Sequence, residues 1–371
     1  MNEQVGAAKP APTPNEIDFG GGKAVETNAD RAGRRYRDRS GPWARFKAYQ
    51  AFSIVAVSIA FLLALVLWTL ISGGEFKFFS YGNLSVLAQQ IPITAIAAIG
   101  VGLLMISGEF DISIAGTFTL VAFVISISVS NLGMPMPVAL LLGLAVAVVI
   151  GVINGLITCW LVIPSFIATI GMMFFLRGAV RFVSINPETN LPDSIAFFPS
   201  DGFKTLLTGH IGGPFSAQLV WLGLVACIGY LILNRHRLGN HMFTAGGNPN
   251  AAISIGVNVR RTKLIAFVIC AVAAGFAGLL QATRINEIEP SYATISGLEL
   301  KAIAAAVVGG VSLFGGRGTI LGIVLGAALI DCVDNVLVLV NAPETIFRGI
   351  LGAVVILAVV LNNLVSRREV S

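Results

Sequence analysis

A long run without Asp, Glu, Lys or Arg is the feature that most limits what this chain can fold into. Residues 112–176 contain none of these side chains. A helix needs roughly 20 apolar residues to cross a bilayer, so the run is long enough for three crossings. Turn residues interrupt it near Gly133 and again at Pro164. The run therefore predicts membrane-spanning helices at 112–130, 137–160 and 165–183.

Apolar runs on both sides of this stretch predict further spans, for a total of about ten. These further runs lie at 52–72, 84–107, 218–233, 264–283, 303–314, 319–340 and 345–365. Only 12% of the residues are charged, against about 25% in a soluble domain. We therefore expect an all-α polytopic membrane protein, with one membrane domain over residues 51–371. The short run at 303–314 either crosses the bilayer or is re-entrant.

The positions of Lys and Arg set the expected orientation, because positively charged loops stay in the cytoplasm. Basic clusters lie before the first span, in the loop 234–263 and after the last span. With ten spans all of them fall on one side, so both termini are expected in the cytoplasm and the loop 186–217 outside. Residues 1–50 are polar and rich in Pro and Gly, which predicts a disordered basic tail. We expect its charges to meet membrane lipid rather than nucleic acid.

One segment of the loop 234–263 predicts a short exposed helix. Asn248 suits the N-cap, Pro249 the first helical position and Gly256 the stop. A helix of about two turns would then display Ala251 and Ala252, whose small side chains fit a groove on another protein. The residues assigned to this docking segment are Gly246, Gly247, Asn248, Pro249, Ala251, Ala252 and Gly256.

Polar side chains within or beside the predicted spans are the candidates for a translocation path. A charge at the centre of a bilayer costs about 2.5–3.5 kcal/mol on insertion scales, so such groups should avoid lipid. The candidates are Gln89, Gln90, Asp111, Asp331, Asp334 and Asn335. For Asp331 and Asp334 the stronger expectation is a structural role or a place near the outer mouth, paired with Arg348, rather than a place in the path. For Asp111 the stronger expectation is a capping role at the start of the next helix.

The sequence lacks the common motifs for nucleotide binding, catalysis and metal binding. No Gly-x-x-x-x-Gly-Lys-Ser/Thr phosphate loop occurs, and there is no nucleophile elbow or His-Glu-x-x-His motif. The cysteines are isolated, with no spacing that suggests a metal site. We expect neither enzymatic activity nor a bound cofactor or metal in this chain.

Three segments together resemble the membrane subunit of ribose-type monosaccharide ABC importers. The first is 297–319, a small-residue helix followed by a glycine turn. The second, 107–116, keeps the Gly, Asp and Ser of the family pattern Gly-Gly-Ile-Asp-Leu-Ser-Val-Gly, with Glu109 and Ala115 where glycines are common. The third, 245–257, resembles the coupling loop that docks on the ATPase subunit.

The resemblance implies a permease subunit in the bacterial cytoplasmic membrane that moves a monosaccharide or related polyol by alternating access. The implied partners are a second permease subunit, identical or closely related, a cytoplasmic ATPase that carries ATP and magnesium, and an extracytoplasmic sugar-binding protein that meets the loop 186–217. A related ABC permease for nucleosides, branched-chain amino acids or a furanose signal is the alternative within the class. An ion-coupled secondary transporter would use Asp331 and Asp334, but would need no docking helix. A non-transporting scaffold is disfavoured, because the sequence shows no soluble output domain.

Overall fold

The computed structural model describes residues 51–72, 76–186, 189–197, 199–294 and 297–343, with isolated positions up to 356. The chain divides into the units Met1–Tyr49 and Gln50–Ser371. The predicted basic tail and most of the predicted tenth span lie outside the described residues. All further statements concern the second unit.

Within the described residues, seven helices are long and apolar enough to cross a membrane. They are α3 (Ala51–Ile71), α4 (Tyr81–Ile106), α6 (Met136–Cys159), α7 (Ser165–Val183), α9 (Ala217–Asn234), α12 (Val259–Ile285) and α14 (Ile320–Leu339). The apolar helix α5 (Ile114–Ser130) and the small-residue helix α13 (Leu298–Val308) are shorter. The chain is therefore an all-α polytopic membrane protein, as predicted, and the count of ten spans stays a prediction.

Short elements connect these helices. They are β1 (Ile195–Ala196), α8 (Asp201–Thr208), β2 (His210–Gly212), β3 (Phe215–Ser216), α10 (Arg237–Gly247), α11 (Pro249–Ser254), β4 (Glu287–Ile288) and the 3-10 helix η1 (Pro290–Ala293). The strand β1 pairs antiparallel with β4. This pairing joins the loop 186–217 to the segment after α12, and the prediction puts both on the outer side.

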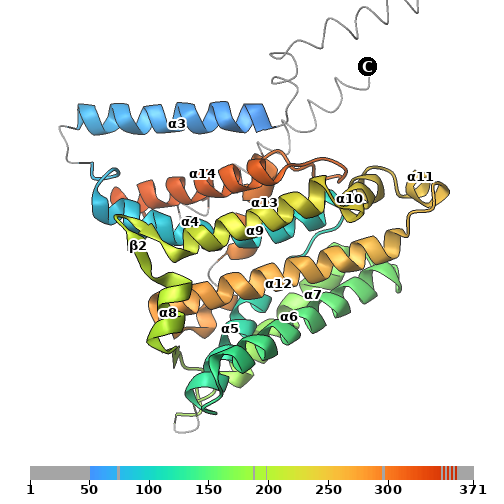
Figure 1. The fold of residues 1–371 in the computed structure, drawn as a ribbon, viewed down its shortest axis with the longest axis horizontal. Coiled ribbons are helices and arrows are strands. Elements are labelled where there is room, and N and C mark those ends of the chain that lie inside the picture. Colours follow the sequence, from blue (N-terminus) through green and yellow to red (C-terminus); the bar gives the residue numbers. More distant parts are fainter. Residues whose placement is uncertain are drawn as a thin grey trace, which may run out of the picture. The chain divides into compact units, whose positions relative to one another are not determined.

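Helix α12 is the centre of the packing and contacts α4, α5 and α6 (Figure 1). Glycines on the neighbouring helices allow the backbones to meet. A Cβ at Gly100 of α4 would lie 3.1 Å from Cα of Cys270, and one at Gly151 of α6 would lie 2.7 Å from Cα of Val268. Small residues stabilise helix pairs in membranes because they permit this approach, which brings more atoms into van der Waals contact.

A proline inside α4 frees one backbone carbonyl, and a side chain from another segment satisfies it. Pro92 has no N–H, so the carbonyl of Ala88, four residues earlier, loses its helical partner. The hydroxyl of Ser216 donates to this oxygen over 3.0 Å. The helix therefore continues past Pro92 without an unsatisfied carbonyl, which would be costly in hydrocarbon.

We expect Gly278→Ala to destabilise the fold, since its Cβ would lie 2.1 Å from the carbonyl oxygen of Phe118. Relief of that clash requires a backbone shift between α12 and α5, with an expected loss of about 1–3 kcal/mol. Thermal unfolding of the purified protein in detergent measures the loss. The control is Gly223→Ala in α9, where nothing lies within 4 Å of the added Cβ. Equal melting temperatures for the two variants would contradict this account.

Candidate functional site

The predicted docking helix forms as the residues indicated. Asn248 caps α11, with its Oδ1 accepting from the backbone N–H of Ala251 over 3.0 Å. Pro249 takes the first helical position. The chain leaves the helix through Gly256 at φ +86°, a conformation that favours glycine. Its role in docking is not tested by this geometry and remains a prediction.

The surface of this helix differs from the prediction in one respect. Ala251 is exposed, but Ala252 is buried with 1% of its surface accessible. Successive residues of an α-helix point about 100° apart, so neighbours on a short helix seldom share a face. The large apolar side chains on the exposed surface are Ile253 and Ile255, at 61% and 71% exposure. The expectation that Ala252 is displayed was therefore wrong, and the exposed isoleucines were missed.

Glycines join the docking segment to two other parts of the chain. A Cβ at Gly246 would lie 2.0 Å from the carbonyl oxygen of Ile106, at the end of α4, and 2.7 Å from the backbone nitrogen of Gly316. Gly315 and Gly316 belong to the turn between α13 and α14 and have φ values of +79° and +73°. The N–H of Gly316 donates to the carbonyl of Ile106 over 2.9 Å.

We call this contact of Gly108, Gly246, Gly315 and Gly316 the glycine junction. Gly108, with φ +87°, lies just after α4, and its Cβ would meet Cα of Gly246 at 3.2 Å. Three segments thus meet backbone to backbone, with no flexible side chain between them. The docking segment is therefore in direct backbone contact with the end of α4 and with the α13–α14 turn.

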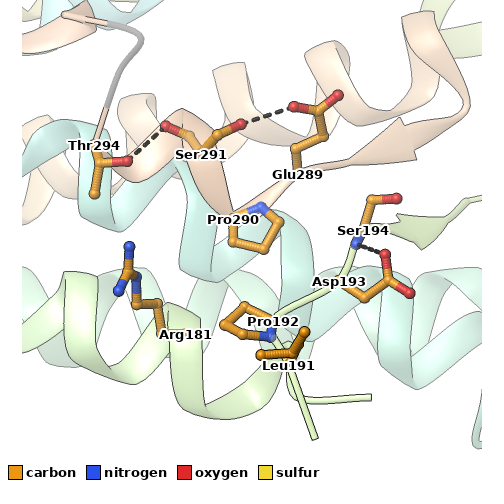
Figure 2. A pocket seen from close by; sticks show the side chains of 9 residues that line it. All are labelled: Arg181, Leu191, Pro192, Asp193, Ser194, Glu289, Pro290, Ser291 and Thr294. Carbon is orange, nitrogen blue, oxygen red and sulfur yellow. Dashed lines mark hydrogen bonds between the residues drawn. The ribbon is translucent and has the colours of Figure 1, made fainter. Parts of the chain in front are cut away.

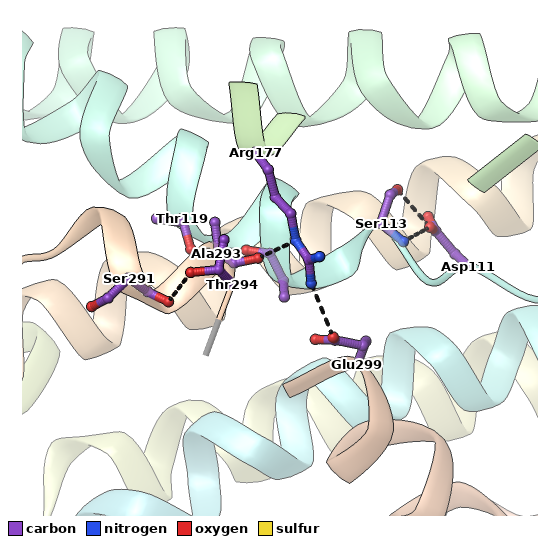
Figure 3. Close-up of polar contacts among 9 residues, drawn as sticks. Asp111, Ser113, Thr119, Arg177, Ser291, Ala293, Thr294 and Glu299 are labelled. Atoms are coloured by element: carbon purple, nitrogen blue, oxygen red, sulfur yellow. Dashed lines mark hydrogen bonds and ion pairs between the residues drawn. The ribbon is translucent and has the colours of Figure 1, made fainter. Parts of the chain in front are cut away.

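Asp111 organises the start of α5. Its Oδ1 accepts from the N–H and the hydroxyl of Ser113 over 2.7 and 2.6 Å (Figure 3). Asn154 of α6 donates to Asp111 Oδ2 over 3.2 Å and to the Ser113 hydroxyl over 3.0 Å. Burial raises the pKa of the Asp111 carboxyl above its usual range, and these hydrogen bonds oppose the shift. Asp111 thus stabilises the helix start through its N-cap residue, and Asn154 is a partner that sequence reasoning missed.

Glu109, where the family commonly has glycine, forms an ion pair. Its Oε1 lies 2.6 Å from Nζ of Lys263, at the start of α12, and both side chains are largely buried. The added carboxylate therefore has a countercharge from another helix.

No group of His, Cys, Asp and Glu among the described residues has the arrangement of a metal site.

Two polar residues of α14, Asp334 and Asn335, have partners on α13 and α4. Lys301 donates to Asp334. The amides of Asn83 and Asn335 exchange two hydrogen bonds of 2.8 Å. The predicted partner Arg348 lies outside the described residues, and Lys301 is the partner that the sequence did not indicate.

Asp331 is the exception among the predicted path residues. It is fully buried, and neither carboxylate oxygen has a hydrogen-bond partner among the described residues. The side chains of Gln90 and Thr94 on α4 approach it. Gln89, by contrast, makes a long contact of 3.5 Å with the hydroxyl of Ser85 on its own helix. The structure thus brings Gln90 and Asp331 together and leaves Gln89 and Asp111 apart from them.

A second ion pair ties α7 to α13. Arg177 Nε donates to the carbonyl of Ala293 over 2.8 Å, and its Nη2 lies 3.6 Å from Glu299 Oε1 (Figure 3). Glu299 and Lys301 lie two residues apart on α13, so they point in different directions. Through these pairs α13 is held to α7 and to α14 near its N-terminus.

A pocket of about 570 Å³ lies between the loop 186–217 and η1 (Figure 2). Arg181, Asp193 and Glu289 contribute its charges. Ser291 donates to Glu289 over 2.7 Å, and the N–H of Ser194 donates to Asp193 over 2.8 Å. Both carboxylates are therefore held in place in the lining of this pocket, on the predicted outer side.

Comparison with known proteins identifies the family. The model of the family described as branched-chain amino acid transport system / permease component matches residues 83–359. The chain belongs to this family of transport permeases. The ribose import permease protein of Escherichia coli (strain K12) is 32% identical over 303 residues, which cover 81% of this chain and 91% of that protein. No solved structure matches.

Other relatives of the permease are named as permease proteins of further transport systems. The autoinducer 2 import system permease protein of Klebsiella pneumoniae subsp. pneumoniae is 34% identical over 306 residues, covering 82% of this chain and 85% of that protein. The D-allose transport system permease protein of Escherichia coli (strain K12) is 28% identical over 307 residues, covering 83% and 91%. The resemblance to ribose-type permeases drawn from the motifs is thus confirmed.

We expect Gly246→Ala in the permease to impair coupling, because a Cβ there has no room between Ile106 and Gly316. The change should reduce transport at least tenfold while ATP hydrolysis by the assembled complex continues. Gly247→Ala is the matched control, since its Cβ would have only Gly316 Cα nearby, at 3.8 Å. Transport and ATP hydrolysis, measured together in proteoliposomes, separate the two variants. Normal transport by Gly246→Ala would contradict the role of the glycine junction.

Proposed function

We propose that this chain is the membrane permease subunit of an ABC importer that carries a monosaccharide or related polyol into the cytoplasm. The observation that carries the proposal is similarity over almost the whole membrane domain to import permeases for ribose, D-allose and autoinducer 2. The cytoplasmic membrane of a bacterium is the corresponding location. Branched-chain amino acids, named in the family description, are the alternative cargo.

The partners follow from this role. A separate cytoplasmic ATPase would bind ATP and magnesium, since the chain has no phosphate loop of its own. A second permease subunit would complete the path. An extracytoplasmic sugar-binding protein would deliver the cargo to the outer side, where the pocket beside η1 lies. We assign the docking of the ATPase to the segment 246–256, in which exposed Ile253 and Ile255 provide an apolar contact surface.

Alternating access can be derived from the contacts already described. Closure of the ATPase pair would move α11. The glycine junction would pass the movement to α4 and to the α13–α14 turn. At the other end, separation of the Lys301–Asp334 and Asn83–Asn335 contacts would open the path between α4, α13 and α14. We assign the path to this helix interface, with Gln90, Asp331, Asp334 and Asn335 as its residues.

An ion-coupled transporter is the rival from another class. It would require membrane carboxylates that are free to take up an ion, and Asp334 is held by Lys301. The docking helix has no role in a self-sufficient transporter. Asp331 has no such ion-pair partner among the described residues, so the observation that favours the ATP-driven importer is the docking helix.

The first expected outcome is ATP-dependent uptake. Cells that carry the complete importer should accumulate labelled D-ribose, D-allose, D-galactose or D-fructose, and a Walker-lysine mutation in the partner ATPase should reduce uptake to background. Uptake that survives this mutation but collapses with an uncoupler would contradict the proposal and favour the ion-coupled rival. Uptake of a branched-chain amino acid instead of the sugars would change the cargo and leave the class intact.

The second expected outcome concerns docking. Ala251→Glu and Ile253→Glu should each reduce co-purification of the ATPase at least tenfold, because a charge replaces an exposed apolar contact with little effect on the fold. Thr205→Glu, an exposed change on α8, is the control and should leave co-purification unaltered. Ala252→Glu should disturb the packing of α11 itself. Normal co-purification with both Ala251→Glu and Ile253→Glu would remove the docking assignment.

A further inference from the structure

Asp331 lies at a polar centre to which several helices contribute. Gln90 and Thr94 of α4 and Lys301 of α13 act on its carboxyl. Arg284 of α12 interacts with it electrostatically. Polar side chains at membrane depth are costly, so they face the protein interior or a path for the transported substance. Three helices, α4, α12 and α13, therefore place polar groups near one buried carboxylate of a fourth helix, α14.

The carboxylate of Asp331 has spare hydrogen-bonding capacity, in contrast to the carboxylate of Asp334. Asp334, one turn further along α14, accepts from Lys301. Asp331 has none of its surface exposed, and neither oxygen makes a hydrogen bond of normal length and angle with a described residue, although the side chains of Thr94 and Gln90 lie close to it. A buried acceptor without a donor reduces stability, so it requires an explanation. A ligand that supplies donors during transport provides one.

The charges around Asp331 indicate what kind of ligand fits. Lys301 and Arg284 balance Asp331 and Asp334, so the centre has no excess charge to hold a cation or an anion. A carboxylate accepts hydrogen bonds from hydroxyl groups, while Thr94 and Gln90 can both donate and accept. The matching ligand is a neutral molecule with several hydroxyl groups.

We propose that Asp331, together with Thr94 and Gln90, forms a transient subsite that binds the hydroxyl groups of the sugar as it passes between α4 and α14. This inference rests on the proposed import function and deepens it. The subsite is closed in this structure, with the Asn83–Asn335 hydrogen bonds joining the same two helices toward the outer side. Passage requires that contact to open, after which Asp331 becomes accessible to the ligand.

The test compares Asp331→Asn with Asp334→Asn in the full chain. Asp331→Asn should reduce uptake of labelled D-ribose, D-allose, D-galactose and D-fructose at least tenfold, at normal abundance and with normal ATPase co-purification. The purified protein should melt at about the same temperature, because the change removes no ion pair of Asp331 and Lys301 keeps Asp334 as its partner. Asp334→Asn should melt at a lower temperature, because Lys301 loses its partner.

A second variant tests the subsite without altering charge. Thr94→Val replaces a hydroxyl by a methyl group of similar size, and it should reduce uptake several-fold with little change in melting temperature. Uptake of deoxy analogues distinguishes binding from a structural role, because a purely structural defect would reduce the uptake of every analogue equally. For the analogue that lacks the hydroxyl held by Asp331, Asp331→Asn should cause a much smaller loss of uptake than it does for the parent sugar.

The outcomes separate this inference from the proposed function. If the wild-type importer takes up none of the sugars in an ATP-dependent manner, the proposed function fails, and the subsite with it. If the wild type imports a sugar and Asp331→Asn imports it equally well, the subsite alone is wrong. Parallel losses of uptake and melting temperature in both Asp331→Asn and Thr94→Val would assign these residues to the fold and overturn the subsite.

Discussion

Hydrocarbon offers no hydrogen bonds, so each polar group at membrane depth depends on a partner within the protein. This requirement explains several contacts between segments far apart in the chain. The hydroxyl of Ser216 satisfies the carbonyl that Pro92 frees in α4. Asn83 and Asn335 satisfy each other's amides. The resulting contacts hold α4 to the loop before α9 and to α14, and so position the helices that enclose the proposed path.

Small residues have the complementary role, because they let backbones meet where side chains would separate them. On the predicted cytoplasmic side this produces the glycine junction, in which Gly246 leaves no room for a methyl group between Ile106 and Gly316. On the predicted outer side α14 is linked to α13 and α4 by side-chain contacts, such as Lys301 with Asp334 and Asn83 with Asn335. A rigid contact at the ATPase side and separable contacts at the other are what a transport cycle driven from the cytoplasm requires.

Much of the fold follows from local patterns in the sequence. The apolar runs located the helices α4 to α7 to within a few residues, because bilayer thickness sets the length of a span. The cap at Asn248 and the stop at Gly256 follow from backbone geometry that only certain residues favour. Contacts between residues far apart in the chain could not be predicted from these local patterns. Asn154 as the partner of Asp111, and Lys301 as the partner of Asp334, depend on how helices pack and not on spacing along the chain.

The sequence by itself determined that the chain crosses a membrane, which loops carry positive charge and where the docking helix begins and ends. These properties depend on length, composition and local backbone preference, all of which act within a few turns of the chain. The tertiary structure decided that Ala252 is buried while Ile253 is exposed. It also decided that Asp334 is paired and Asp331 is not. Such differences arise because the residues of one helical turn point in different directions. How the helix packs against its neighbours decides which of these side chains are buried and which are exposed.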